Sequence, residues 1–113
     1  ISDKCKIAME EAVVQAKNAG LEADGAVGEA QNINCTIAEK GAGKAVKTFK
    51  KARVKFDDAF TKLNNATDED RIEYLIEYLN STISVIEQGM GELKKGTDEL
   101  NEVLKELNQC NSL

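Results

Sequence analysis

The sequence predicts an all-α fold, a small disulfide-stapled helical bundle of four or five helices that forms a single domain over residues 1–113. Proline is absent from the 113 residues, where average usage would give about five or six. Ala, Glu, Lys and Leu are abundant, and all four are good helix formers. Apolar residues recur at spacings of three and four and not in the alternation typical of strands.

The first two helices are expected to form a tight antiparallel hairpin. The first begins after Ser2, a favourable N-cap residue, and runs to about Ala19, with Gly20 ending it. The second is expected from residue 22 or 24 to Lys40. Small side chains let the two helices approach closely; these are Ala8, Ala12, Ala16, Ala19, Ala23, Ala26, Ala30 and Ala38.

A third helix is expected between two breaks in the chain. The run Gly41-Ala42-Gly43 predicts the first break, and Asn64-Asn65 predicts the second. The helix between them, 44–63, has one apolar face that holds all three phenylalanines of the protein and that we interpret as core. This face consists of Ala45, Phe49, Ala52, Phe56, Phe60 and Leu63.

The last helix carries the strongest pattern. Thr67 and Asp70 resemble a capping box ahead of it, and apolar residues then follow a heptad repeat. Two interpretations stay open: one long helix, bent at Gly89, Gly91 and Gly96, or a break at Gly96 followed by a fifth helix. The stripe consists of Ile72, Ile76, Leu79, Ile83, Ile86, Met90, Leu93, Thr97, Leu100, Leu104 and Leu107.

Three cysteines indicate disulfide chemistry. The chain has no histidine, and a structural zinc site needs four Cys or His ligands. Cys5 and Cys35 are equidistant from the expected turn at Gly20, so we predict that they form the internal disulfide. Cys110 would then be left over and could join two chains into a dimer. The rival pairing joins Cys110 to Cys5 or to Cys35.

Three glycosylation sequons favour a secreted, extracellular protein. They begin at Asn34, Asn65 and Asn80, and each fits the pattern N-x-[ST]. No apolar run approaches the roughly 20 residues that span a bilayer. The chain begins with Ile1, and we expect either a mature protein whose signal peptide has been removed or a trimmed fragment.

The residue types needed for catalysis are not found together. Without histidine, Ser-His and Cys-His arrangements cannot form. No phosphate-binding loop or EF-hand pattern is present. The net charge of −5 argues against nucleic-acid binding, which needs a basic surface. We therefore expect a non-enzymatic binding protein without cofactor or metal.

One segment departs from the acidic composition. Residues 40–55 contain seven basic residues and no acidic one. At 100° per residue, Lys44, Lys47, Lys51 and Lys55 lie opposite the phenylalanine face. They form either a solvated outer face, balanced by the acidic last helix, or a recognition ridge for an acidic protein surface or a sulfated glycan.

The combined pattern resembles a family of mosquito salivary proteins. It consists of the Cys5-containing first helix, the Asn34-Cys35-Thr36 segment and a heptad helix that ends at Cys110. In this it is similar to the anopheline salivary inhibitors of the alternative complement pathway, the albicin-like proteins. The resemblance implies a secreted helical protein in saliva that evades host immunity by binding a plasma protein, the convertase of that pathway. A carrier of a small hydrophobic ligand and a self-associating structural protein are the alternatives.

Overall fold

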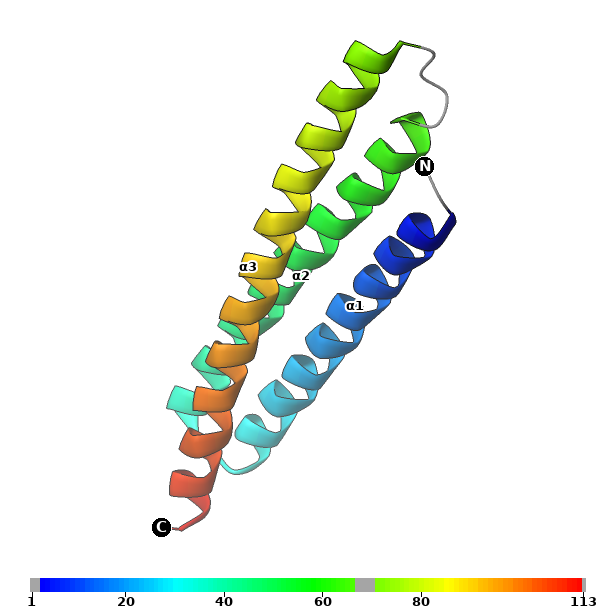
Figure 1. Ribbon diagram of the computed structural model, residues 1–113. Coiled ribbons are helices and arrows are strands. Elements are labelled where there is room, and N and C mark those ends of the chain that lie inside the picture. The colour runs from blue at the N-terminus through cyan, green and yellow to red at the C-terminus, as the bar shows by residue number, and fades with distance from the viewer. Residues whose placement is uncertain (1–2, 67–70, 113) are drawn as a thin grey trace.

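Three long helices lie side by side in an elongated molecule (Figure 1). The computed structural model describes residues 3–66 and 71–112, and within these ranges all regular structure is helical. The helices are α1 (Asp3–Asn32), α2 (Thr36–Ala66) and α3 (Ile72–Asn111). The all-α prediction is confirmed, but the expected number of four or five helices is wrong. The molecule measures 63 × 18 × 15 Å.

Helix α2 is the centre of the fold. It packs along both neighbours, whereas α1 and α3 approach each other at only a few residues. The chain reverses direction twice, so α1 and α3 run parallel and both are antiparallel to α2 (Figure 1). The α1–α2 turn and the C-terminal end of α3 therefore lie at the same end of the molecule.

Gly20 lies inside α1 and does not end a helix. The residues on either side of it continue one apolar face, on which Ala16, Ala23, Ala26 and Ala30 are buried against α2. A Cβ atom built on Gly20 would lie 3.7 Å from the Cβ of Phe49, which shows that α1 and α2 are close together here. The gain from burying a continuous face outweighs the cost of about 1 kcal/mol for a glycine within a helix.

The turn expected at Gly20 occurs instead at Ile33–Cys35. Asn34 adopts a left-handed conformation, with φ 55°, which asparagine tolerates better than most residues. The Cys35 amide donates to the Ala30 carbonyl over 2.9 Å, and the Asn34 amide donates to the Gln31 carbonyl over 3.2 Å. This pair of bonds is the Schellman motif, with Asn34 in the position that glycine usually takes.

Helix α2 continues through Gly41 and Gly43, so the expected break there is also wrong. A Cβ atom on Gly41 would lie 2.9 Å from Cγ2 of the buried Val103, so this glycine allows α3 to approach. Phe49 and Phe56 are buried as predicted, and Phe60 is half-buried. Alanine fills most of the remaining buried positions of α2: Ala38, Ala42, Ala45, Ala52, Ala59 and Ala66.

Helix α3 is continuous through all three of its glycines, which confirms the long-helix interpretation. The capping box expected at residues 67–70 lies outside the described residues. In heptad terms, with Ile76 as position a, the stripe predicted from the sequence occupies positions a and d. The helix instead turns positions d and g inward. Position g holds the buried residues Thr82, Gly89, Gly96 and Val103.

The disulfide joins Cys35 to Cys110, with 5.9 Å between their Cα atoms. The predicted Cys5–Cys35 bond is therefore wrong, and so is a dimer through Cys110. The reason is the continuity of α1. Cys5 and Cys35 lie at opposite ends of it, about 45 Å apart at 1.5 Å per residue, and Cys5 is exposed near its start. The bond ties the end of α3 to the α1–α2 turn.

Candidate functional site

Six exposed cations of α2 form a surface that we call the α2 basic face. Helix α2 contains eight Lys and Arg against three Asp and Glu, whereas α3 contains three against eight. The central helix is thus positive and its neighbour is negative. The α2 basic face consists of Lys40, Lys44, Lys47, Lys50, Lys51 and Arg53.

The ridge expected from the sequence is mostly present on this face. Lys44, Lys47 and Lys51 are exposed, whereas Lys55 is half-buried. Phe49 and Phe56 are buried on the opposite side of the helix. The sequence therefore assigned the outward direction of three of its four lysines correctly, and their role in binding stays a prediction.

The positive charges of the α2 basic face are largely uncompensated by the protein itself. Among the described residues, Lys44 is the one member within 4.0 Å of a carboxylate, at 3.8 Å from Glu99 Oε2. The Lys44 side chain nevertheless remains 71% exposed. The positive potential of the α2 basic face is therefore directed toward solvent.

A hollow of about 800 Å³ lies within the α2 basic face, on the side next to α3. Lys40, Lys44 and Lys47 line it, together with Gly43 and the exposed side chain of Ile37. Two carboxylates, those of Glu39 and Glu106, also line it. A Cβ atom on Gly43 would meet nothing within 4 Å. Packing therefore does not require glycine at this position, and its effect is to leave the helix backbone bare between three lysines.

A row of three glutamates on α3 lies along the contact between α2 and α3. Glu92, Glu99 and Glu106 recur every seven residues, at heptad position c, and all three are half-buried. Glu92 and Glu106 each have one buried carboxylate oxygen without a hydrogen-bond partner, and both oxygens of Glu99 are in this state. These carboxylates favour the positive α2 as their neighbour and help to define which side of α3 faces it.

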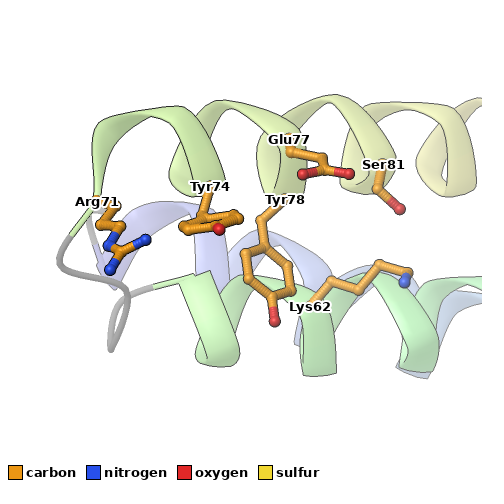
Figure 2. Close-up of a pocket in the computed structure, with 6 residues that line it drawn as sticks. All are labelled: Lys62, Arg71, Tyr74, Glu77, Tyr78 and Ser81. Carbon is orange, nitrogen blue, oxygen red and sulfur yellow. The ribbon is translucent and has the colours of Figure 1, made fainter.

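A second hollow, of about 520 Å³, lies between the end of α2 and the start of α3 (Figure 2). Tyr74 and Tyr78, the two tyrosines of the protein, both line it. Arg71 stacks over the Tyr74 ring, 5.4 Å from its centroid, a favourable cation–π geometry. Lys62 enters from α2, and Figure 2 shows Glu77 and Ser81 along the α3 side.

The sequence pointed to neither hollow, although signals for both were present. Tyr74 and Tyr78 are four residues apart and so share a helix face. Gly43 stands in a lysine-rich segment, where the sequence alone predicts a helix break. In both cases, recognising the site required knowing that the surrounding helix is continuous.

The acceptor residues of all three sequons are exposed. Asn34 lies in the α1–α2 turn, Asn65 near the end of α2 and Asn80 within α3. Thr67 of the second sequon lies outside the described residues. In the part of the chain that is described, no three Cys, Asp or Glu side chains are grouped in a way that could hold a metal ion, and no helix is long and apolar enough to cross a membrane.

Comparison with known proteins identifies no relative: no family model, no curated protein and no solved structure matches this chain.

Proposed function

We propose that this protein is a secreted, non-enzymatic binding protein that inhibits a host defence cascade, and that the α2 basic face is its docking surface. The observation that carries the proposal is the set of six exposed cations of the α2 basic face, of which Lys44 is the one within 4.0 Å of a carboxylate among the described residues, on a chain with a net charge of −5. A surface of this kind attracts an acidic protein over a distance and speeds its association. The partner we propose is a plasma protein with an acidic surface.

The alternative complement pathway is the first cascade to test. This choice rests on the resemblance to albicin-like salivary proteins, which bind the convertase of that pathway. The assay is lysis of erythrocytes under conditions in which only this pathway is active. The proposal expects the parent protein to inhibit lysis at micromolar concentration or below. Full lysis, together with unchanged clotting and contact activation, would contradict inhibition of a host cascade.

Charge reversal tests whether the α2 basic face is the docking surface. Lys47 and Lys51 are changed together to Glu, and Lys95 and Lys105 of α3 are changed together as a control with the same net charge. The first variant should lose inhibition, and the control should keep it. Inhibition by the first variant equal to that of the parent would mean that the α2 basic face is only a solvated surface.

A second function is favoured by the hollow at Tyr74 and Tyr78. Two phenol rings, Lys62 and Arg71 suit a small aromatic molecule that carries a negative charge. This is more polar than the hydrophobic ligand of a typical carrier. Because the protein has no tryptophan and both tyrosines line the hollow, intrinsic fluorescence reports on this site alone. Salicylate is a suitable probe, and saturable quenching that is lost in Arg71→Ala would support this function.

A further inference from the structure

Helix α3 exposes a column of apolar side chains along its length. Ile76, Ile83, Met90 and Leu104 recur at heptad position a, and each is 48–59% exposed. Thr97 occupies the remaining position of the column and is also exposed. Its hydroxyl donates to the Leu93 carbonyl over 2.9 Å, so the polar group is already satisfied within the helix. We call these five residues the α3 column.

The α3 column borders an open side of the bundle. Leu104 and Thr97 line a hollow of about 590 Å³ between α1 and α3, which also contains Ala19 and Gly25. A Cβ atom on Gly25 would meet nothing within 4 Å. Because α1 and α3 approach each other so little, the column remains uncovered where a fourth helix would lie in a four-helix bundle.

The residues that flank the column identify the helix that would fit there. They occupy heptad position e: Glu73, Asn80, Glu87, Lys94, Asn101 and Asn108. In an antiparallel pair of helices, position e of one helix faces position e of the other. When two α3 helices are centred on Met90, residues equally far from Met90 in the sequence lie opposite each other, and Glu87 lies within one residue of Lys94 of the other copy. The same register places Asn80 within one residue of Asn101 and Glu73 within one residue of Asn108, so no like charges meet at position e.

The apolar residues fit the same register. Met90 faces Met90 of the other copy, Ile83 faces Thr97, and Ile76 faces Leu104. Lys94 also bonds Asp98 of its own helix over 3.1 Å, but an ammonium group has three donors and can serve both carboxylates. One arrangement therefore covers the apolar column and pairs the charges beside it.

We propose that two copies of this chain associate through α3, antiparallel and around a two-fold axis at Met90. Such an interface is self-complementary, as closed dimers require. The column is about 42 Å long at 1.5 Å per residue, and a helix about 10 Å wide covers roughly 400 Å² of it. Stable interfaces bury about 800 Å² per partner. The dimer is therefore expected to be weak.

The same geometry makes the dimer sensitive to modification at Asn80. This residue lies between Ile76 and Ile83 along the α3 column and within one residue of Asn101 of the other copy. A glycan on Asn80 is too bulky for this interface. We therefore expect the dimer only for chains without a glycan at Asn80. Dimerisation does not depend on whether the α2 basic face binds a plasma protein.

Sedimentation equilibrium of the full, unglycosylated, disulfide-bonded chain tests the proposal. Between about 1 and 300 μM, the parent should change from monomer to dimer. Met90→Glu should remain monomeric throughout, because it would bring two carboxylates together in an apolar seam. Val54→Glu is the matched control, since Val54 on α2 is 57% exposed and Met90 on α3 is 59% exposed. This control should dimerise like the parent, and circular dichroism should show that both variants are folded.

Charge swaps test the antiparallel register. Glu87→Lys and Lys94→Glu should each weaken the dimer several-fold, and the double variant should recover, because the pair then forms with its charges exchanged. A parent that stays monomeric at about 300 μM would overturn the proposal and leave the α3 column to a helix of another protein. A dimer that persists in Met90→Glu would overturn the α3 interface, and a double swap without recovery would overturn the register.

Discussion

The closeness of α2 and α3 can be tested with one methyl group at Gly96. A Cβ atom there would lie 2.7 Å from Cε1 and 2.8 Å from Cδ1 of Phe49, well inside the optimal carbon–carbon distance of about 3.5–4.0 Å. The Phe49 ring is 1% exposed and packs with Ala23 and Ala45. An added methyl group must therefore displace the ring or one of the helices from its position.

The expected loss follows from two opposing effects. Overpacking a filled core costs about 1–3 kcal/mol, and replacing a helical glycine with alanine gains about 1 kcal/mol. Gly96→Ala should therefore lower the free energy of unfolding by about 0–2 kcal/mol. Gly91→Ala is the matched control five residues earlier, where an added Cβ would meet nothing within 4 Å, and it should be more stable than the parent by up to about 1 kcal/mol.

Urea denaturation followed by circular dichroism measures both variants. The difference between them, about 1–3 kcal/mol, isolates the steric cost because both carry the same gain in helix propensity. Combining Gly96→Ala with Phe49→Leu should recover part of the loss, because the smaller side chain makes room for the methyl group. If Gly96→Ala stabilised the protein as much as Gly91→Ala, the reasoning that the Phe49 ring lies directly on the α3 backbone would be refuted.

Three further predictions concern the disulfide and the α2 basic face. The free energy of unfolding of the double variant Cys35→Ser, Cys110→Ser should be lower by about 4.5 kcal/mol on the chain-entropy model, because the disulfide closes a loop with a sequence separation of 75. Urea denaturation in the absence of reductant measures this difference. A loss below about 1 kcal/mol would contradict the prediction. Gly43→Ala should stabilise the fold by up to about 1 kcal/mol yet weaken partner binding by narrowing the hollow; stability equal to the parent or below it would show a packing role for Gly43. Reversing Lys47 and Lys51 to Glu should slow association with the partner and make the association rate less dependent on salt. Surface plasmon resonance at two salt concentrations would measure both effects. An unchanged association rate would contradict a role of these lysines in attracting the partner.

The helical class and the buried aromatic face were predictable because both depend on local patterns. The absence of proline and the spacing of Phe49 and Phe56 act within one helix and do not depend on its neighbours. The outward direction of Lys47 and Lys51 follows from the same periodicity. These features hold in the structure even though the helices that contain them are longer than expected.

The number of helices could not be predicted in the same way, because a glycine has two opposite uses. The sequence favours helix breaks at Gly20 and Gly41, yet both glycines lie within helices where a neighbouring helix comes close. The break was at Asn34, a weaker signal than glycine in a left-handed position. Whether a glycine ends a helix or admits a neighbour depends on what lies beside it, and a single helix does not contain that information.

The disulfide error followed directly from this. With a turn at Gly20, Cys5 and Cys35 would have faced each other across a hairpin. Moving the turn to Asn34 separates them by the length of α1 and brings Cys35 to the end of α3, where Cys110 lies. The sequence alone leaves the rival pairing of Cys35 with Cys110 open, and the position of one turn decides between the two.

The uncovered α3 column is a consequence of two glycines of α3, Gly89 and Gly96. A heptad with apolar positions a and d would ordinarily turn both toward its neighbour. The rings of Phe49 and Phe56 need flat surfaces, and α3 provides them at position g, with Gly96 beneath the first ring and Gly89 beneath the second. Turning position g toward α2 rotates the helix by about 60° from the ordinary arrangement, given 3.6 residues per turn. Position d stays partly covered and position a moves out toward solvent, so the close packing of α2 on α3 and the exposed apolar surface of α3 have one cause.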